Sequence, residues 1–339
     1  MSIDDRSGGP YLVTGAAGFI GSNVAQRLLA AGKRVVGVDN LNDYYSVALK
    51  QDRLVPLQAD KNFTFYLGDI ADMAFLAQAF AEPPSVIIHL AAQAGVRHSL
   101  EHPEDYVHSN LIGFFNVLEA CKVAQVRHLV YASSSSIYGA NTKVPFSEED
   151  RADEPVSLYA ATKRSNELMA HSYAHNHGLA ATGLRFFTVY GPKGRPDMAY
   201  FGFVDKYFFG EPLRIFNNGD FDNDLYRDFT YIDDIVEGVV RVTERPPTSP
   251  VPHQVFNIGN SQPVRLMEFI RTLETALSKS LGRDVVFEKR FEPLKTGDVP
   301  ATYADTRQLE AAVGFRPETP LVEGLQRFTD WYVQYFGRV

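Results

Sequence analysis

A glycine-rich turn between an apolar segment and a helical segment is the feature that most constrains the fold of this chain. Residues 11–14 have the pattern of a short buried strand, and residues 15–21 read Gly-Ala-Ala-Gly-Phe-Ile-Gly. A helical pattern then runs to Gly32, and a second strand pattern over residues 34–38 ends at Asp39. A strand, a glycine turn, a helix, a strand and an acid in this order predict a dinucleotide-binding unit.

Each part of this unit has a physical role. Gly15 permits the tight turn, Gly18 lets the backbone approach a pyrophosphate, and Gly21 lets the helix pack closely against the strand. The N-terminus of the helix faces the phosphate charge. Asp39 would accept hydrogen bonds from the adenosine ribose hydroxyls and would repel a 2′-phosphate, so the sequence predicts NAD rather than NADP.

Strand patterns alternate with helical patterns as far as about residue 187. This alternation predicts an α/β fold: a Rossmann-type doubly wound parallel sheet with ligands at the carboxyl ends of its strands. Later residues are richer in turns and prolines, which predicts a smaller mixed α/β lobe for the substrate. We expect a flexible tail over 1–9, an NAD-binding domain over 10–187 with returning segments near 233–243 and 256–259, and a substrate lobe mainly over 188–339.

Charge and cysteine content narrow the classes of partner. The net charge of −8 argues against a nucleic acid or an anionic membrane as the main partner. The single cysteine, Cys121, allows no internal disulfide and fits a reducing cytoplasm. No run of residues is long and apolar enough to predict a membrane span, and no signal-peptide pattern is present.

Two local patterns point to proton transfer. Tyr159 and Lys163 lie four residues apart in a predicted helix over 158–177, so the phenol and the ammonium can project into one volume. A tyrosine with a pKa of about 10 is a poor base at neutral pH, and a nearby cation favours its charged form. Four serines, 133–136, end the fifth predicted strand, where a hydroxyl can donate to a substrate oxygen. Taken singly, these patterns are equally those of an ordinary helix and turn.

Together, the glycine turn, the serines and the Tyr159/Lys163 pair resemble the extended short-chain dehydrogenase/reductase family, in its nucleotide-sugar epimerase and dehydratase branch. The blocks that resemble UDP-glucuronate 4-epimerases are 39–45, 91–97, 185–192, 194–199 and 227–234. The resemblance implies that Tyr159 is the base on the sugar 4-hydroxyl while hydride passes from C4 to NAD. It also implies that Lys163 holds the nicotinamide ribose and lowers the tyrosine pKa, and that Ser134 is the catalytic serine. The 4-keto sugar then rotates so that its other face meets the cofactor, hydride returns to that face, and NAD stays bound.

The resemblance also implies which residues contact the two ligands. Those expected at NAD are Gly15, Gly18, Phe19, Ile20, Gly21, Asp39, Asn40, Asn42, Asp69, Ile70, Ala91, Ala92, Gln93, Asn110, Ser133, Tyr159, Lys163 and Phe186. Those expected at the UDP-sugar are Arg97, Ser134, Ser135, Ser136, Tyr159, Thr188, Arg195, Phe216, Arg227, Lys295 and Asp298. Within the second group, Phe216 would stack on uracil, Arg227 would neutralise the diphosphate and Asp298 would bind the ribose.

The glucuronate carboxylate needs partners of its own, and Thr188, Arg195 and Arg97 are placed for it by motif. Asparagine stands at the position of Thr188 in the galactose branch, and this departure argues against UDP-galactose. A 4-keto glucuronate is a β-keto acid that can lose carbon dioxide. We expect Ser135, Thr188 and Arg195 to hold the carboxylate with its breaking bond out of line with the ketone π system.

Several alternatives stay open at this point. They are a UDP-glucuronate decarboxylase, a 4-epimerase of neutral UDP-sugars, a dehydrogenase that exchanges its cofactor, and an inactive NAD-sensing scaffold. A dehydratase is disfavoured because Ser135 and Ser136 stand where that branch carries Asp-Glu. The resemblance further implies a homodimer formed through the predicted helices 106–124 and 158–177.

No metal site is predicted from the sequence. Asp220, Asp222 and Asp224 have the spacing of a calcium loop, but Leu225 stands where that loop needs glycine. A histidine pair four residues apart, at 171 and 175, lacks a third ligand and is typical of a solvated helix face.

Overall fold

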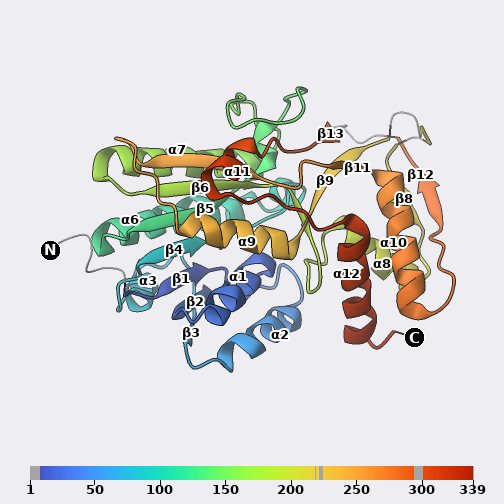
Figure 1. Ribbon diagram of the computed structural model, residues 1–339, viewed down its shortest axis with the longest axis horizontal. Coiled ribbons are helices and arrows are strands. Elements are labelled where there is room, and N and C mark those ends of the chain that lie inside the picture. Colours follow the sequence, from blue (N-terminus) through green and yellow to red (C-terminus); the bar gives the residue numbers. More distant parts are fainter. Residues whose placement is uncertain (1–7, 218, 221–223, 294–300, 339) are drawn as a thin grey trace.

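A parallel sheet of seven strands organises the larger part of the molecule (Figure 1). The computed structural model describes residues 8–217, 219–220, 224–293 and 301–338. The strands lie in the order β10-β6-β5-β4-β1-β2-β3. Their bounds are β1 Tyr11–Thr14, β2 Val35–Asp39, β3 Phe63–Leu67, β4 Val86–His89, β5 His128–Ser134, β6 Ala181–Phe186 and β10 His253–Ile258. The chain order reverses between β1 and β4, which confirms the predicted doubly wound α/β fold and puts its ligand crevice at that point.

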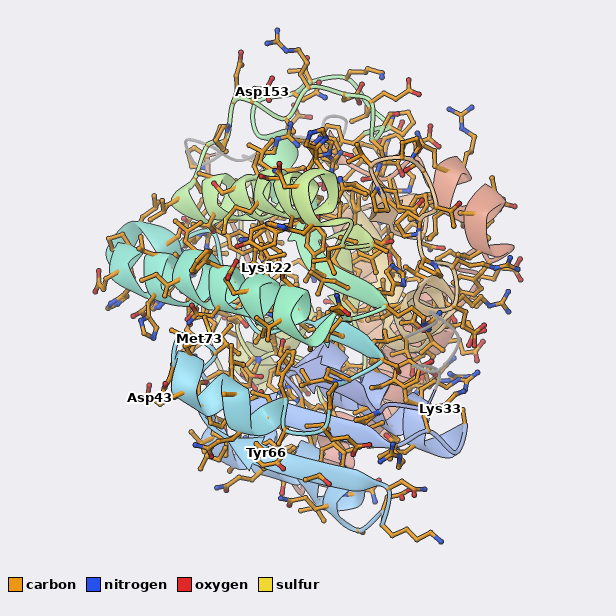
Figure 2. The ribbon with its side chains drawn as sticks, turned by 90° about the vertical axis from the view of Figure 1, so that its left-hand side faces the viewer. Lys33, Asp43, Tyr66, Met73, Lys122 and Asp153 are labelled. Atoms are coloured by element: carbon orange, nitrogen blue, oxygen red, sulfur yellow. The ribbon has the colours of Figure 1, made fainter. Side chains whose placement is uncertain are left out.

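Helices cover both faces of this sheet because neighbouring residues of each strand point to opposite sides. On one face Val13 packs in the core beneath α1 (Phe19–Ala30), α2 (Val47–Gln58) and α9 (Ile232–Thr243). On the other face Leu12 packs beneath α3 (Met73–Ala79), α6 (Phe114–Ala124) and α7 (Leu158–His177). Figure 2 shows this second side, with Lys122 on α6 and Tyr66 on the edge strand β3.

The segment predicted as one helix over 106–124 is divided in the structure. Two short helices, α4 (His98–Glu101) and α5 (Pro103–Tyr106), lead into a π-helical stretch, η2 (Val107–Gly113), before α6 begins. The Asn166 side chain on α7 donates to the backbone carbonyl of Asn110 at 2.6 Å. A side chain that takes a carbonyl from the helical ladder is a usual cause of such a local widening.

The second lobe combines small sheets with helices at one end of the large sheet (Figure 1). Its elements are β7 Thr188–Tyr190, α8 Ala199–Phe209, β8 Leu213–Ile215, β9 Tyr226–Tyr231, β11 Pro263–Arg265, α10 Leu266–Leu281, β12 Lys289–Phe291, β13 Ala301–Thr302 and α12 Leu321–Tyr335. Between them in the chain, α11 Arg307–Val313 returns to the large sheet and packs on β10 and α9 (Figure 1). The aromatic residues of α12, among them Phe328 and Tyr332, pack on Phe201 of α8. One continuous apolar core runs from Val13 in the large sheet to Phe328, so the two lobes are joined by burial.

A buried ion pair fixes α7 against the sheet. Arg185 on β6 donates to both carboxylate oxygens of Glu167 on α7, at 2.9 and 3.0 Å, and the Ser133 hydroxyl donates to the same carboxylate at 2.7 Å. Burial raises the pKa of Glu167, but Arg185, together with hydrogen bonds from Ser133 and Arg164, leaves that pKa below its ordinary value. The ionised pair therefore sets the position of the helix that carries Tyr159 and Lys163.

No helix within the described residues combines the length and the apolar character that a bilayer span needs.

Candidate active site

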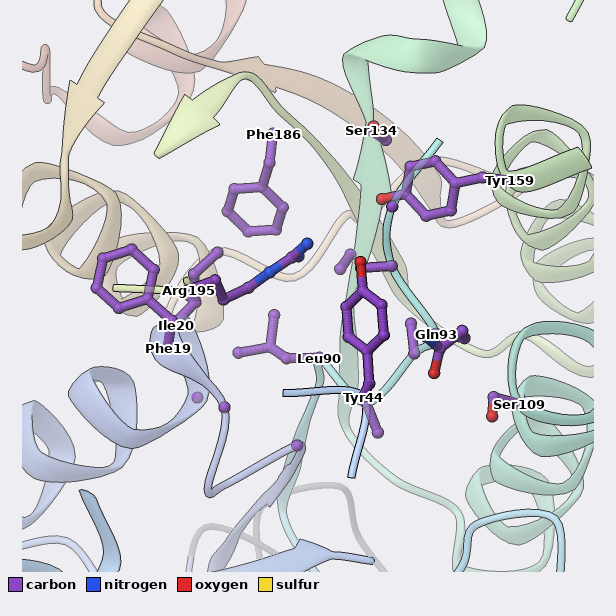
Figure 3. A pocket seen from close by; sticks show the side chains of 18 of the residues that line it. Phe19, Ile20, Tyr44, Leu90, Gln93, Ser109, Ser134, Tyr159, Phe186 and Arg195 are labelled. Atoms are coloured by element: carbon purple, nitrogen blue, oxygen red, sulfur yellow. The ribbon is translucent and has the colours of Figure 1, made fainter. Parts of the chain in front are cut away.

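A cavity of ≈ 660 Å³ opens where the strand order reverses, between the ends of the central strands and the second lobe (Figure 3). Most of the predicted ligand-binding residues line it. The exceptions among the described residues are Asn110, Phe216 and Arg227, while the predicted Lys295 and Asp298 lie outside the described residues. The fold therefore gathers residues from 15 to 198 of the chain around one space.

The glycine turn leaves room for an anion at one end of the cavity. Gly15 has a φ of +71°, and a Cβ at Gly21 or Gly18 would lie 2.0 or 2.9 Å from the Gly15 carbonyl oxygen. Gly18 caps α1 without any side-chain hydrogen bond, so the first-turn amides have no side-chain acceptor there. Uncapped amides at a helix N-terminus, with backbone in place of side chains, fit the diphosphate of a dinucleotide.

The acid at the end of β2 is held in a fixed orientation. The Asp39 carboxylate accepts from the Ala17 amide at 3.0 Å and from the Leu41 amide at 2.9 Å. A carboxylate has about four acceptor positions, so two remain for ribose hydroxyls. Lys50, which the sequence analysis missed, also lines this end and donates to the Asn42 backbone carbonyl at 2.7 Å. Burial lowers the pKa of Lys50.

Another predicted cofactor contact, Asn110, lies behind the cavity wall. Its side chain accepts from the Gln93 amide at 2.9 Å and donates to the Gln93 carbonyl at 3.0 Å. It also donates to the Thr162 hydroxyl at 3.1 Å, which connects the loop after β4 to α7. Asn110 thus positions Gln93, which does line the cavity.

Tyr159 on α7 and Ser134 at the end of β5 lie next to each other on one wall of the cavity (Figure 3). Ser134 accepts a hydrogen bond from the Ser136 amide at 3.2 Å, which leaves its own proton for Tyr159. Burial raises the pKa of Tyr159 above its ordinary value, while the nearby Ser134 hydroxyl and the charge of Arg195 act to lower it. Ser133 also lines the cavity, but its hydroxyl is held by Glu167.

Lys163 differs from its predicted role in one respect. Its ammonium donates to the Ala132 carbonyl at 2.9 Å, and burial lowers its pKa to about 8. The predicted lowering of the Tyr159 pKa by Lys163 is not found, because Arg195 is the cation whose charge acts on this phenol. Lys163 lies one helical turn from Tyr159, but its ammonium is directed at the end of β5 and not at the phenol.

Arg195 belongs to a network that joins the two lobes across the cavity. Its guanidinium pairs with the Asp197 carboxylate, with an Nε–Oδ1 distance of 3.0 Å. The Tyr44 hydroxyl, from the loop after β2, donates to the same carboxylate at 3.1 Å. Burial raises the Asp197 pKa, but the charge of Arg195 and the hydrogen bonds from Arg195 and Tyr44 together leave it below its ordinary value. Burial, followed by the charge of Asp197, raises the pKa of Tyr44 to about 12. The sequence blocks contained both residues without assigning either a role.

Arg53 on α2 is another functional residue that sequence reasoning missed. Its side chain is only 2% exposed. It donates to the Ala17 carbonyl in the glycine turn at 3.0 Å, and to the Lys193 and Gly194 carbonyls at 2.6 and 3.1 Å. It also donates to the Tyr45 hydroxyl. One side chain thus ties the glycine turn to the loop that carries Arg195.

The residues predicted at the nucleotide lie farther along the second lobe. Phe216 follows β8, and the Arg214 guanidinium lies 5.9 Å from the centre of its ring. Arg227 lies on β9 and donates to its neighbour's carbonyl, that of Tyr226, at 2.7 Å. The cavity does not include either side chain, so their predicted contacts with uracil and diphosphate stay predictions.

We predict that Arg53→Met loosens the loop that carries Arg195. The substitution leaves three buried carbonyls without their charged donor, which should lower the free energy of unfolding by at least about 2 kcal/mol. Hydrogen exchange should rise at the amides of residues 191–197. Urea denaturation and exchange measured by mass spectrometry check the two effects.

A matched control is Arg27→Met on α1, because Arg27 is half exposed and makes only a surface ion pair with Glu237. That change should cost less than about 1 kcal/mol and leave exchange over 191–197 unaltered. Equal exchange in both variants would contradict the role assigned to Arg53.

Comparison with known proteins agrees with this geometry. The "NAD dependent epimerase/dehydratase family" matches residues 11–259. A "Probable UDP-glucuronate 4-epimerase" of Rhizobium meliloti (strain 1021) is 49% identical, over 97% of this chain and 98% of that protein. UDP-glucuronate 4-epimerase 2 of Arabidopsis thaliana is 45% identical, over 98% of this chain and 78% of that protein.

A solved structure shares the whole architecture. The UDP-glucuronic acid 4-epimerase of Bacillus cereus, crystallised with UDP-glucuronic acid and NAD, has a TM-score of 0.84 and 34% identity. The match covers 96% of this chain and 99% of that one. Because a family match over most of the chain coincides with relatives near half identity, this chain belongs to the NAD dependent epimerase/dehydratase family.

Proposed function

We propose that this chain is a UDP-glucuronate 4-epimerase that interconverts UDP-glucuronate and UDP-galacturonate with tightly held NAD. The observation that carries the proposal is the Tyr159 phenol facing the Ser134 hydroxyl in a cavity that also contains the Arg195 guanidinium (Figure 3). A base and a cation for a carboxylate are the two groups that 4-epimerisation of a uronic acid requires. Relatives with this name support the same reaction.

The NAD half of the cavity follows from the glycine turn and the strand ends. The first-turn amides of α1 would hold the diphosphate, and the two free acceptor positions of Asp39 would hold the adenosine ribose. Lys163 would hold the nicotinamide ribose from the α7 side. When bound, NAD supplies the acceptor that takes hydride from C4 of the sugar and returns it.

Proton movement is assigned to Tyr159 and Ser134. The Tyr159 oxygen takes the proton of the sugar 4-hydroxyl and later gives it back to the 4-oxygen. The Ser134 hydroxyl would donate to that phenolic oxygen, which favours the ionised form, as does the charge of Arg195. Burial acts in the opposite direction, so the base depends on these two neighbours.

The sugar carboxylate is assigned to Arg195 with Thr188 and Ser135. All three line the cavity, and arginine binds a carboxylate through two parallel hydrogen bonds. Asp197 already fixes the plane of the Arg195 guanidinium, so the substrate would meet a preset orientation. A neutral sugar has no group that requires this cation, and for that reason we favour a uronic acid over neutral UDP-sugars.

We also propose a homodimer that forms through α6 and α7. Four apolar side chains on α6, on α7 and just before α6 are at least 45% exposed: Ile112, Phe115, Val123 and Leu168. The two helices pack on each other, and Figure 2 shows their outer side. Burial of such side chains against a second copy would stabilise a dimer. The free, buried Cys121 on α6 suits a reducing cytoplasm, where we place the enzyme.

Light scattering after size exclusion tests the dimer. Wild-type protein should run as a dimer, and Phe115→Lys should shift it toward a monomer because a charge enters the apolar contact. Val55→Lys is the control, since Val55 on α2 is also exposed, more so than Phe115, but lies away from this side. A wild-type monomer would overturn the assignment.

We predict that Tyr159→Phe removes almost all turnover but keeps NAD. Loss of a general base costs about 10²- to 10⁴-fold in rate, whereas the ring and its packing on Tyr106 stay in place. Protein is incubated with UDP-glucuronate and no added NAD, and products are resolved by NMR. Retained NAD is measured after denaturation.

Tyr173→Phe on the same helix is the control, because its hydroxyl donates to Glu119 far from the cavity. It should turn over like the wild type. Full activity of Tyr159→Phe would remove the phenol from the mechanism, and accumulation of NADH by the wild type would indicate a cofactor-exchanging dehydrogenase. A wild type that binds NAD but converts no UDP-sugar would indicate a scaffold.

We predict that Arg195→Ala and Thr188→Ala release more carbon dioxide per epimerisation event. A charged hydrogen bond contributes about 1.5–3 kcal/mol, so losing the Arg195 contact should raise the ratio of UDP-pentose to UDP-galacturonate about 10- to 100-fold. NMR with UDP-glucuronate labelled at the carboxylate carbon measures both products. Arg214→Ala, an exposed arginine outside the cavity, is the control.

An unchanged product ratio in both variants would show that these residues do not restrain the carboxylate. UDP-pentose as the main product of the wild type would instead identify the chain as a UDP-glucuronate decarboxylase.

A further inference from the structure

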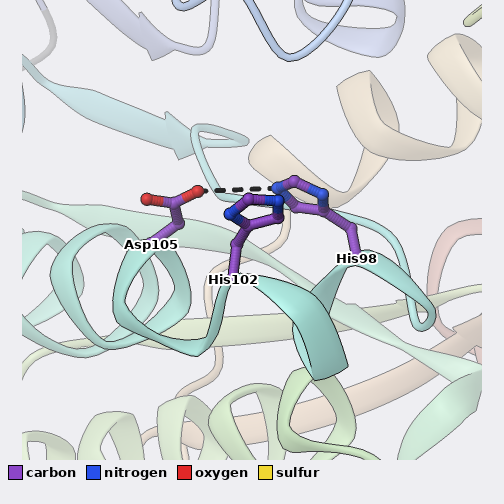
Figure 4. A group of neighbouring side chains, drawn as sticks. All are labelled: His98, His102 and Asp105. Carbon is purple, nitrogen blue, oxygen red and sulfur yellow. Dashed lines mark ion pairs between the residues drawn. The ribbon is translucent and has the colours of Figure 1, made fainter.

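Two histidines and an aspartate meet at the rim of the cavity, on short helices that the sequence analysis did not predict (Figure 4). His98 begins α4, His102 is the residue between α4 and α5, and Asp105 lies in α5. The three ligand atoms lie within 4.8 Å of one another. Within the part of the chain that the structure describes, this is the one group of three such side chains placed to share an ion.

We propose that His98, His102 and Asp105 bind a divalent transition-metal ion of the Zn²⁺ class, and that the bound ion stiffens this rim of the cavity. Two imidazoles with one carboxylate favour Zn²⁺ and similar ions over Ca²⁺ and Mg²⁺, which prefer oxygen ligands. Three protein ligands leave a fourth position of a tetrahedral ion open to water.

The distances suit such an ion with one small adjustment. Bonds of about 2.0–2.1 Å place the ligand atoms of a tetrahedral zinc about 3.4 Å apart. His98 Nε2 and Asp105 Oδ2 already lie at 3.5 Å. The His102 ring stacks on that of His98 with centroids 4.4 Å apart, so His102 has to turn to direct a nitrogen at the ion. Its side chain is exposed and free of a packed core, where such turns take nanoseconds or less.

The backbone that carries these ligands is well fixed. The Tyr106 hydroxyl donates to the Ala94 carbonyl at 2.9 Å, and the Ser99 hydroxyl donates to the Val96 carbonyl at 2.6 Å. Tyr106 itself is fully buried. Ligands on a fixed backbone with mobile side chains bind an ion without refolding of the segment.

Of the three proposed ligands, His98 is the one that lines the cavity. Its ring lies 4.7 Å from that of Tyr44, whose hydroxyl donates to Asp197, the partner of Arg195. An ion on His98 would hold this ring, and with it one wall of the space that Tyr44 occupies. This consequence rests on the function proposed above, whereas binding of the ion does not.

Titration of the tag-free protein with Zn²⁺ tests the site. In competition with a chromophoric chelator, the wild type should bind one equivalent, and Co²⁺ in place of Zn²⁺ should give the visible bands of a tetrahedral ion. His102→Ala and Asp105→Asn each remove one of three ligands. Each should weaken binding by more than the roughly 10- to 100-fold that loss of an outer-shell partner costs.

His175→Ala is the matched control. His175 is an exposed histidine on α7, and a second histidine, His171, stands four residues before it, as His98 stands before His102. The control variant should bind Zn²⁺ like the wild type. The site is refuted if the wild type does not compete with the chelator, if His102→Ala or Asp105→Asn retains full affinity, or if His175→Ala weakens binding as much as they do. Circular dichroism of all variants checks that each is folded.

A second measurement separates the ion from its effect. Zn²⁺ at one equivalent should slow epimerisation by the wild type several-fold and leave His102→Ala unaffected. Binding without slowing would refute the link through Tyr44 but not the metal site. A wild type inactive toward every UDP-sugar would refute the proposed function, and the chelator titration would still decide the site.

Discussion

The buried guanidinium of Arg53 is the interaction on which the geometry of the site depends. It lies in the core with no carboxylate partner, and its N–H groups point at carbonyl oxygens of Ala17, Lys193 and Gly194. A buried cation is tolerated only when its donors are satisfied in this way. Because one rigid side chain contacts both lobes, the turn for the cofactor and the loop with Arg195 keep a fixed separation.

Opposing electrostatic effects meet at Tyr159. Burial favours the neutral phenol, whereas the neighbouring Ser134 hydroxyl and the Arg195 charge favour the phenolate. Arg195 therefore has two uses in the proposed reaction, as a partner for the sugar carboxylate and as a cation near the base. Asp197 keeps the arginine oriented and at the same time offsets part of its charge at the phenol. The protein thus adjusts its base through residues from both lobes.

Much of the site could be predicted because its signals are local in the sequence. The glycine turn, Asp39 at a strand end and the Tyr159/Lys163 spacing each depend on a few consecutive residues whose geometry is set by one strand or helix. The structure gathers these residues around one cavity. The prediction that Lys163 lowers the Tyr159 pKa rested on the two residues sharing one helix face. In the structure the Lys163 ammonium donates to the Ala132 carbonyl, and this direction depends on how β5 packs against α7.

The residues that were missed depend on contacts between distant parts of the chain. Arg53 reaches Lys193 across 140 residues, and Tyr44 reaches Asp197 across 153. No periodicity in a single segment reports such pairs. His98 and Asp105 meet for a different reason, since the helix predicted from residue 106 is preceded by two short helices joined at His102.

The doubly wound sheet, the place of its ligand crevice and the tyrosine on α7 could be predicted from the residues alone, because strand and helix periods and glycine turns are properties of short segments. The cation that acts on the phenol, the side chains that join the lobes and the histidines that come together could be identified only in the folded chain. Those outcomes depend on burial and on the direction of individual side chains, and both are fixed only when the two lobes share one core.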